Sequence, residues 1–569
     1  MLVVLLLALC LAGCPCRAIQ VSLPAGNLTG TTGTTYFKNR TIFKFMGIPY
    51  AESPVKENRF MPPKKLTRWD GVLDATSNGP ACQQMQVSHH RTLKNVFKNE
   101  SLLAEADNYS EDCLRLDVHS PQLNGSLPVL FYIHGGSFIE GASHNIKPEF
   151  LLEHDIVLVA PQYRLGPLGF LKLDISDKTG NAAMYDLVMA LEWVRDNINQ
   201  FGGDPNDVTI SGISAGAAAA ALLYVSPLTK DLFSKVMLFS GSAVAPWVID
   251  NEPYRHSQAV ANITGCVGAT DDESLKCLQG KNAPDIVFAY LQHAMNERQQ
   301  GRHGMGGTIP IVDDVFLTEL PEATLKNEEF KGRPMLMSTT RNEGIFLTDT
   351  LKEYYIDVNN LENNIDVWKY DVADILMGFS DIKDSSYTVG AAIIEKYFSS
   401  DVMGKLSQMT PGIIDFNGAA YFKGPALKMA ELNAMRNGTT YLATFTYDPD
   451  GKGVNHAADQ KYLFPFDLPS YTDRDFNMVK KMTRMCANFV IHGSPTGSSS
   501  DALEGVNWSP YSRENNAYLS IDDSVQLKRA FEQEFAITEL ERRRRSSSAG
   551  VHSPWHIGLL LLVGLYHRL

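Results

Sequence analysis

The feature that most restricts the fold of this chain is the pentapeptide Gly-Ile-Ser-Ala-Gly at residues 212–216. It follows a β-branched run, 208–210, and leads into an alanine-rich stretch, 217–223, that favours a helix. A strand, a sharp turn and a helix in this order form a nucleophile elbow, which holds a serine hydroxyl in a strained, exposed position above a sheet. A Cβ at residue 212 or 216 would then collide with backbone. Ser214 is therefore a candidate nucleophile at a helix N-terminus, which favours developing negative charge; an ordinary glycine-rich turn is the alternative.

Length and composition are those of a large globular protein. The 569 residues allow three average domains or one large α/β domain, and 44% hydrophobic residues predict an extensive core. The formal net charge of -13 argues against nucleic acid or an anionic membrane surface as the main partner. Because no repeat, low-complexity linker or clear composition break interrupts residues 19–540, one catalytic domain is the simplest interpretation.

The N-terminus has the pattern of a secretory signal. Residues 2–11 are apolar but too few to span a bilayer, and small residues follow, which predicts a cleaved signal over residues 1–18. The sequence Leu-Ala-Gly-Cys at 11–14 also resembles a bacterial lipoprotein box, which is the alternative. Eight Asn-x-Ser/Thr sequons favour a glycosylated eukaryotic secreted protein instead. They begin at Asn27, Asn39, Asn99, Asn108, Asn124, Asn262, Asn437 and Asn507.

Five cysteines remain once the signal is removed. In an oxidising compartment the natural bridges join the local pairs Cys82 with Cys113 and Cys266 with Cys277, each closing a short loop for about 3 to 4 kcal/mol. Cys486 is left over, in a stretch whose apolar residues recur at helical spacing. We predict a buried, inert thiol there, with an intermolecular bridge as the alternative.

Segments rich in Val, Ile and Leu alternate with helical patterns through the first half of the chain. This alternation is typical of an α/β protein with a mostly parallel, doubly wound sheet. We expect buried strands at 127–133, 156–160, 208–211 and 235–240, with a helix at 185–201. In the second half we expect strands at 334–338 and 440–447, separated by a helical cap insertion over about 351–436.

A second chemical motif follows the first of these strands. The segment 128–141 runs from a buried strand into His-Gly-Gly-Ser-Phe at 134–138. Consecutive glycines allow backbone N–H groups to point into a cleft, where they and the N–H of Ala215 can stabilise a tetrahedral oxyanion. Each such donor is typically worth about a hundredfold or more in rate. A plain turn after a strand is the alternative.

A serine nucleophile also needs a base and an orienting acid, which in this type of sheet follow in the order Ser, Asp or Glu, His. Glu343 lies just past an expected strand and beside Gly344, at the functional edge of the sheet. His456 follows the strand 440–447 in a glycine-rich loop. His456 would accept the Ser214 proton, while Glu343 would fix its tautomer and stabilise the imidazolium. A solvated loop carboxylate and a non-catalytic histidine are the alternatives.

Further motifs, long and in a fixed order, extend from the first to the last third of the chain. They are Phe-Met-Gly-Ile-Pro-Tyr-Ala at 45–51, Ser-Glu-Asp-Cys-Leu at 110–114, Tyr-Arg-Leu-Gly-Pro-Leu-Gly-Phe at 163–170, Phe-Gly-Gly-Asp-Pro at 201–205, Arg-Asn-Glu-Gly at 341–344 and Asn-His-Ala at 455–457. With the elbow, they resemble the type-B carboxylesterases, which include cholinesterases and the insect juvenile hormone and detoxifying esterases. The resemblance covers about residues 21–531.

This resemblance implies an α/β-hydrolase fold and hydrolysis of carboxylic esters through an acyl-enzyme on Ser214, with no metal or organic cofactor. It also implies the two disulfides inferred above. It places the oxyanion donors at Gly136, Ser137 and Ala215.

Three departures from the family pattern bear on the substrate. Ser137 stands where the family usually has Gly or Ala, and its side chain is expected to crowd the acyl group. Ile213 stands before the nucleophile, where cholinesterases carry Glu and juvenile hormone esterases carry Gln. The loop 82–113 lacks the Trp whose π face holds a quaternary ammonium in cholinesterases. A neutral, lipophilic small-molecule ester is therefore favoured over choline esters.

Three aromatic residues are candidates for an apolar acyl site: Phe138, Phe239 and Trp247. Core packing is the more common role for such side chains and is the preferred interpretation of each.

The C-terminal residues 541–569 have the pattern of a GPI-anchor signal. After an arginine run at 542–545 come Ser-Ser-Ser-Ala-Gly at 546–550, a spacer, and an apolar run at 557–566 that is too short to span a bilayer as a helix. The alternatives are a frayed, processed tail and, for the arginines, a solvated patch or a protease site.

Two classes of function fit the motifs. The first is a secreted or cell-surface serine ester hydrolase, and the second is a non-catalytic adhesion or binding member of the same fold. Such binding members usually lack the nucleophile or its base, whereas Ser214, Glu343 and His456 are all present here. The sequence favours the enzyme, and it leaves the physiological ester and the oligomeric state open.

Overall fold

A computed structural model describes residues 19–84, 109–175, 180–302, 307–380, 382, 387–466, 468–497 and 503–538 of the chain. The expected signal at 1–18 and the expected tail at 541–569 lie outside the described residues. So do two of the sequon asparagines, Asn99 and Asn108.

Strand β8 (Leu127–Ile133) shows how the apolar sequence makes a sheet that is buried on both faces. Successive side chains of a strand point to opposite faces. Val129 and Phe131 accordingly pack into one hydrophobic cluster, whereas Leu130 and Tyr132 pack into another. A continuous apolar run of this kind is what a parallel strand covered on both faces requires.

The described strands form a 13-stranded sheet, parallel in its central part and antiparallel toward both edges. In sheet order its strands are β1 (Ile19–Leu23), β2 (Gly26–Thr34), β3 (Thr41–Pro49), β7 (Arg115–Ser120), β9 (Val157–Pro161), β8, β10 (Gly203–Ile213), β11 (Lys235–Phe239), β12 (Met335–Thr340), β13 (Thr440–Phe445), β14 (Ala517–Ile521) and β15 (Val525–Arg529), with β4 (Val72–Asp74) beside β2. A separate short pair joins β5 (Ala81–Cys82) to β6 (Tyr109–Ser110).

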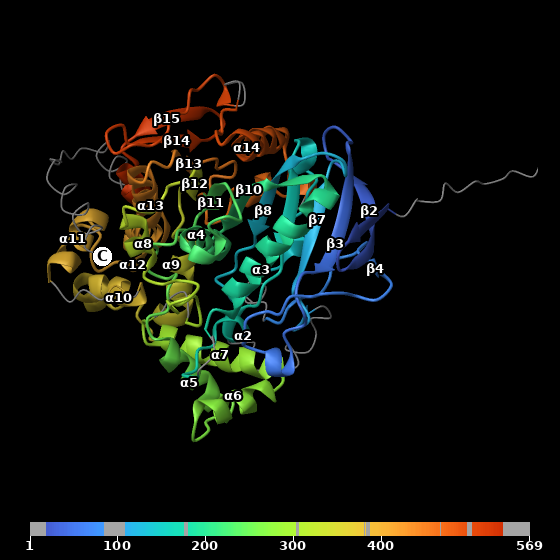
Figure 1. Cartoon of the computed structure of the whole chain (residues 1–569). Helices are drawn as coiled ribbons and strands as arrows, with labels where there is room; N and C mark the ends of the chain where they lie inside the picture. The colour runs from blue at the N-terminus through green and yellow to red at the C-terminus, as the bar shows by residue number, and fades with distance from the viewer. Residues whose placement is uncertain are drawn as a thin grey trace, which may run out of the picture.

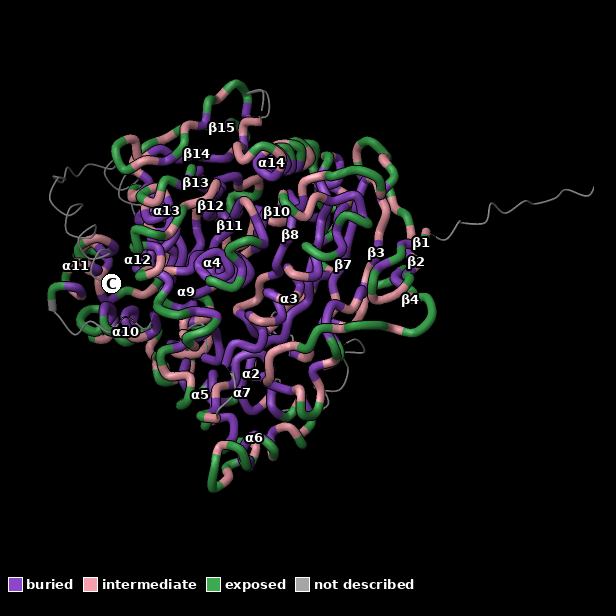
Figure 2. Tube along the Cα trace, in the orientation of Figure 1, coloured by how far each residue is buried: buried purple, intermediate pink, exposed green. Residues whose placement is uncertain are grey.

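Helices cover both faces of this sheet (Figure 1). Helices α3 (Ala182–Asn197), α4 (Ala215–Val225) and α13 (Gly424–Met435) contribute their buried side chains to the cluster that contains Val129. Helix α14 (Asp473–His492) contributes to the cluster on the other face. Figure 2 shows the resulting buried interior, with exposed segments confined to the periphery.

The predicted elements agree with the structure at the centre of the sheet. The strand expected at 127–133 has these bounds, and the strand expected at 208–211 is longer, since β10 begins at Gly203. The helix expected at 185–201 is α3, which starts three residues earlier and is followed by a 3-10 turn, η5 (Ile198–Phe201). The α/β-hydrolase prediction of a mostly parallel, doubly wound sheet is confirmed.

Two helical insertions interrupt the second half of the sheet, and the sequence predicted only the second. Between β12 and β13 lie α9 (Ile345–Leu351), η7 (Lys352–Ile356), η8 (Val367–Asp371), α10 (Val372–Phe379), α11 (Tyr387–Tyr397), α12 (Leu406–Gly418), η9 (Ala419–Lys423) and α13. Between β11 and β12 lie α5 (Pro253–Ile263), α6 (Asp271–Gln279), α7 (Ala283–Gln299) and α8 (Pro321–Lys326). In α7 the buried polar residues His293, Glu297 and Arg298 interrupt the apolar stripe that would have identified it.

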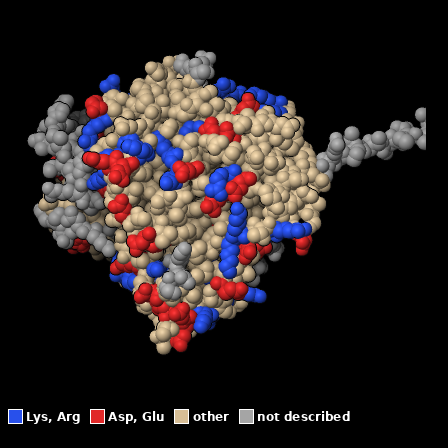
Figure 3. All heavy atoms as spheres, in the orientation of Figure 1, with Lys and Arg blue, Asp and Glu red and all other residues tan. Residues whose placement is uncertain are grey.

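On the face in Figure 3, acidic and basic side chains are interspersed over a largely uncharged surface. Over that face the charge is thus distributed and not gathered into a patch of one sign. Among the helices described, none has both the length and the apolar character needed to cross a bilayer.

Candidate active site

Ser214 lies at the junction of β10 and α4, in the conformation that an elbow requires. Its φ of 58° and ψ of -124° lie in a region that residues with a Cβ rarely adopt. The surrounding structure holds this conformation: the Ser214 N–H donates to the Phe239 carbonyl at 2.8 Å, and the Ser214 carbonyl accepts from the Ala218 N–H at 2.9 Å.

The glycines on either side of Ser214 have the steric function predicted from the sequence. A Cβ on Gly212 would lie 2.4 Å from the Gly216 carbonyl carbon, and one on Gly216 would lie 2.2 Å from the Ile133 carbonyl oxygen. Both contacts are with backbone, which cannot move without displacing β8 or α4. The predicted collision of a Cβ with backbone at either position is therefore confirmed.

The serine is less accessible than the sequence predicted. An elbow was expected to expose the hydroxyl, yet Ser214 is only 6% exposed. The loop after β8 covers it: a Cβ built on Gly135 would lie 3.2 Å from the Ser214 Cβ. The site is thus enclosed, because segments far from the elbow in sequence pack against it.

The glycine loop beside Ser214 carries N–H groups with no partner. The φ angles of Gly136 (117°), Ser137 (54°) and Phe138 (61°) are all positive. Among the described residues, nothing accepts a hydrogen bond from the N–H of Gly136, of Ser137 or of Ala215 at the start of α4. Three free donors therefore stand next to the nucleophile candidate, as an oxyanion hole requires.

His134 fixes the start of this loop. Its ring stacks on Tyr163 with the centroids 4.5 Å apart, and the Tyr163 hydroxyl donates to the His134 carbonyl at 2.9 Å. Burial lowers the pKa of His134 to about 4, so the ring is neutral at physiological pH. The sequence analysis gave this residue no role.

Glu343 follows β12 and is fully buried, with both carboxylate oxygens hydrogen-bonded. Oε1 accepts from the Thr340 N–H at 2.7 Å and from the Ser240 hydroxyl at 2.5 Å. Oε2 lies 2.6 Å from Nδ1 of His456. The alternative of a solvated loop carboxylate is therefore wrong, because the carboxylate is turned inward to donors at the carboxyl ends of β12 and β11.

His456 lies in the loop after β13 with only one of its nitrogens engaged. If Nδ1 donates to Glu343, Nε2 is left as the hydrogen-bond acceptor. Nε2 is buried and has no hydrogen-bond partner among the described residues, so the Ser214 hydroxyl is not bonded to it in this structure. Catalytic hydrogen bonds are often long before substrate binds. The His456 ring lies against Phe346 and Phe422, with centroid distances of 4.7 and 4.5 Å.

The loops that carry Glu343 and His456 are joined directly. The Asn342 N–H donates to the Val454 carbonyl at 2.9 Å, and the Val454 N–H donates to Oδ1 of Asn342 at 3.0 Å. These two hydrogen bonds hold the loops side by side. Glu343, the residue after Asn342, therefore lies opposite His456, which is two residues after Val454. The juxtaposition comes from the parallel neighbours β12 and β13, whose carboxyl ends meet at one edge of the sheet.

Asp459 is a second buried carboxyl group in the loop of His456. Burial raises its pKa to about 6, and the neighbouring Glu343 carboxylate acts in the same direction. One oxygen accepts from Gln460 at 3.0 Å, and the other has no partner among the described residues.

Sequence reasoning did not identify the residues that surround the acid and the base. Ser240 had a usable signal, since it ends an expected strand beside the one carrying Ser214. Phe346, Phe422 and Asn342 had none, because large apolar residues suggest core packing and an asparagine two residues before a glycine suggests a turn.

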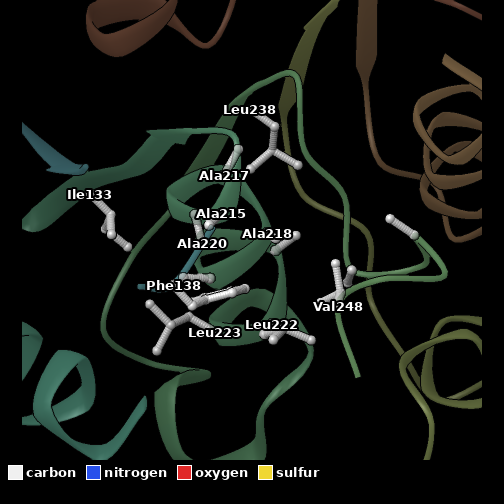
Figure 4. Packing of buried hydrophobic residues seen from close by; sticks show 14 of the residues in the cluster. Ile133, Phe138, Ala215, Ala217, Ala218, Ala220, Leu222, Leu223, Leu238 and Val248 are labelled. Carbon is white, nitrogen blue, oxygen red and sulfur yellow. The ribbon is translucent and has the colours of Figure 1, made fainter. Parts of the chain in front are cut away.

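The three aromatic candidates for an acyl site lie in two different clusters. Phe138 and Trp247 belong to the cluster around α4, with ring centroids 6.4 Å apart, and Figure 4 shows Phe138 against Ala220 and Leu223. Phe239 belongs to the cluster on the opposite face of the sheet. Because strand side chains alternate between faces, Phe239 cannot share an apolar site with the other two.

The structure contains both predicted disulfides, Cys82–Cys113 and Cys266–Cys277. Cys486 is a buried free thiol on α14, and burial raises its pKa, as expected for an inert cysteine. In the part of the chain that is described, no cluster of three or more His, Cys, Asp or Glu residues is arranged to hold a metal ion.

The sheet order and the strand, turn and helix around Ser214 are those of an α/β-hydrolase. The sequence pattern of the carboxylesterase family matches residues 17–537, and the chain belongs to that family. It is a carboxylic ester hydrolase.

Three relatives illustrate the range of similar proteins, each 28% identical to this chain. Esterase E4 of Myzus persicae covers 87% of this chain and 89% of its own length. Liver carboxylesterase of Sus scrofa covers 90% and 91%. Acetylcholinesterase of Bungarus fasciatus covers 90% and 84%.

Proposed function

We propose that the protein hydrolyses neutral, lipophilic carboxylic esters through an acyl-enzyme on Ser214. His456 acts as the general base and Glu343 as its orienting acid. The observation that carries this proposal is the 2.6 Å contact between Nδ1 of His456 and Oε2 of Glu343, which leaves a buried and unpartnered Nε2. A ring nitrogen that accepts no other hydrogen bond can take a proton from the nucleophile.

In the first half of the reaction, the Ser214 oxygen attacks the ester carbonyl carbon as His456 Nε2 takes the hydroxyl proton. The carbonyl electrons move to oxygen and form a tetrahedral oxyanion. Collapse of this intermediate breaks the bond to the alcohol, which leaves with the proton from His456. The acyl group is then bound to Ser214.

In the second half, a water molecule replaces the alcohol. His456 removes one of its protons as the water oxygen attacks the acyl carbon, and the second tetrahedral intermediate returns the proton to Ser214 as the acid leaves. The N–H groups of Gly136, Ser137 and Ala215 stabilise the oxyanion in both steps. This role is supported by the absence of other acceptors for them within the described parts of the chain.

An apolar setting supports a neutral lipophilic substrate. Ile213 precedes the nucleophile and introduces no anionic charge, and two aromatic rings, Phe346 and Phe422, lie against His456. The position before the nucleophile thus offers a quaternary ammonium no carboxylate, and the loop 82–113 contains no Trp whose face could hold one. We therefore place this chain nearer to a general carboxylesterase than to a choline esterase in its substrate preference.

We also propose that the protein is secreted, or held at the cell surface by a GPI anchor that replaces the tail at 541–569. The two disulfides suit an oxidising compartment. The six sequon asparagines that the structure describes are all exposed, as glycosylation requires. Cells producing the full chain should release ester hydrolase activity into the medium, either directly or after treatment with a phosphatidylinositol-specific phospholipase C. Activity retained inside the cells would contradict the proposal.

The central test compares the full chain with its Ser214→Ala variant on a p-nitrophenyl butyrate substrate and on a choline ester. We expect the variant to lose at least about ten-thousandfold in kcat, and an organophosphate to label the wild type at Ser214 alone. Label on another residue would refute the acyl-enzyme, and no hydrolysis by either protein would favour the non-catalytic alternative. Faster turnover of the choline ester than of the butyrate would refute the substrate class.

A further inference from the structure

A lysine is buried behind the candidate active site. Lys423 ends the π-helical turn η9 and is only 2% exposed. Its ammonium donates to the carbonyl oxygens of Arg341 and Glu534, each at 2.6 Å. Lysine is almost never fully buried unless it is paired, because removing its charge from water costs several kcal/mol. The burial of Lys423 therefore requires an explanation.

The two carbonyl groups belong to segments that are far apart in sequence. Arg341 lies two residues before Glu343, in the loop that follows β12. Glu534 lies in η13 (Phe531–Ala536), next to the C-terminal end of the described chain. Lys423 therefore joins the loop of the triad acid to the C-terminal segment 531–538.

Charged groups surround Lys423 on every element packed against it. Glu534 lies on η13, Asp415 on α12, and Glu343 and Arg341 on the loop after β12. Burial lowers the pKa of the Lys423 ammonium and Arg341 acts in the same direction, while the three carboxylates oppose the change. The Glu343 carboxylate thus favours the charged form of the Lys423 ammonium.

A second bridge runs parallel to the first. Asn342 Nδ2 donates to the Thr538 hydroxyl at 3.0 Å, and the Thr538 N–H donates to Oδ1 of Asp415 at 3.2 Å. The two residues that precede Glu343 are thus each tied to the same C-terminal segment. Asn342 also carries the hydrogen bonds to Val454 that align the loop of His456.

We propose that Lys423 is a positioning residue for the ester hydrolase, holding the Glu343 loop against the C-terminal segment 531–538 and supplying a positive charge behind the acid. This inference rests on the proposed roles of Ser214, Glu343 and His456. In its positional part, the two hydrogen bonds of Lys423 hold the loop and thereby fix the orientation of the Glu343 carboxylate. In its electrostatic part, the Lys423 ammonium and an imidazolium formed on His456 would share the single Glu343 carboxylate.

The test uses the full chain with Lys423→Met, Lys423→Arg and Thr538→Val. Active sites are counted with an organophosphate, so that kcat refers to competent enzyme. For Lys423→Met we expect kcat to fall about tenfold with KM within about twofold of wild type, because a displaced acid misaligns the base without touching the substrate. The acid limb of kcat/KM should move to higher pH by about half a unit, since the imidazolium becomes more stable.

The conservative variant separates charge from shape. Lys423→Arg keeps the cation, so its acid limb should stay at the wild-type pH even where kcat is lowered. Thr538→Val removes only a hydroxyl acceptor of Asn342, and should lower kcat about twofold with no shift of the limb. The matched control is Lys428→Met, a lysine on the adjoining helix α13 whose partner is Glu322 at 2.6 Å, and it should leave both quantities unchanged.

Wild-type kcat and an unmoved acid limb in Lys423→Met would overturn the inference, as would an equal loss in Lys428→Met. A loss of kcat without a shift of the acid limb would show that Lys423 has a structural role only, and would also overturn the inference. If Lys423→Met yields no folded protein, Thr538→Val tests whether the C-terminal segment aligns the Glu343 loop. Lys423→Arg then tests whether the positive charge sets the pH of the acid limb. Failure of the proposed function is distinguished by Ser214→Ala, which would then retain activity.

Discussion

The elbow that carries Ser214 is held by steric contacts between backbone atoms, whereas the loops that carry Glu343 and His456 are held by hydrogen bonds between buried polar groups. In the elbow, Gly212 and Gly216 allow β10, α4 and β8 to approach more closely than any side chain permits. Around the acid, donors from Thr340 and Ser240 complete the coordination of one carboxylate.

This difference determines how far apart in sequence the supporting residues lie. The elbow is specified largely by five consecutive residues, and contacts from β8 complete it. The acid and base depend on segments from residue 240 to residue 538, each contributing one or two hydrogen bonds. Steric fit is therefore local in this site, while the arrangement of charge is distributed over the chain. Three sets of substitutions test this difference between the elbow and the loops of Glu343 and His456.

The largest expected effect concerns the hydrogen bonds around Glu343 and His456. Glu343→Gln preserves shape but replaces the acceptor of the His456 proton, so the ring adopts the wrong tautomer; kcat should fall about a thousandfold to ten-thousandfold. Ser240→Ala removes one hydrogen bond and leaves the carboxylate, and should cost about tenfold. The measurement is kcat per organophosphate-labelled site. Equal losses in the two variants would show that hydrogen bonding to the acid, and not its charge, controls the rate.

The next largest effect concerns the elbow and is a change in the stability of the fold. In Gly216→Ala the new methyl group would meet the Ile133 carbonyl oxygen at 2.2 Å, so we expect a loss of about 4 kcal/mol in the free energy of unfolding. The matched control is Gly390→Ala in α11, where the nearest atom would be 3.5 Å away. A helix interior favours Ala there, and stability should rise by up to about 1 kcal/mol. Urea unfolding gives both values, and similar stability of the two variants would contradict the steric account.

The smallest effect concerns Asp459, whose pKa burial raises to about 6 from an ordinary 3.8. Because the folded-state pKa is raised, the folded protein binds this proton more tightly than the unfolded chain does. The stabilisation is complete below about pH 4 and is lost as the pH rises through about 6, a cost of about 3 kcal/mol at neutral pH. Asp459→Asn cannot ionise and should therefore stabilise the fold at pH 8 by about 2 kcal/mol, after a loss of about 1 kcal/mol because Gln460 then donates to a neutral and not to a charged acceptor.

The gain from Asp459→Asn should be smaller at pH 5 than at pH 8, as measured by unfolding at both values. The control is Asp450→Asn, at an exposed position between β13 and His456, which should alter stability at neither pH. A pH-independent gain would indicate that packing, and not the buried charge, limits stability at this position.

The parts of the site that the sequence predicted are those in which neighbouring residues constrain one another. The order of Ser214, Glu343 and His456, each after a strand, follows from the parallel sheet, and both disulfides join cysteines close in sequence. The insertion between β11 and β12 was missed because polar residues inside α7 mask its apolar periodicity. Phe239 was grouped with Phe138 and Trp247, although strand alternation directs it to the opposite face.

The class of fold, the elbow and the candidate residues could be inferred from the sequence, because close backbone packing and strand periodicity produce patterns over a few consecutive positions. Three features are visible only in the folded chain: Ser214 is enclosed, Phe346 and Phe422 flank His456, and a buried lysine links the Glu343 loop to the C-terminal segment. Such contacts join residues far apart in the sequence, with 111 positions between Lys423 and Glu534 and 196 between Asn342 and Thr538. Hydrogen bonds and charges act through space, so no local pattern records them.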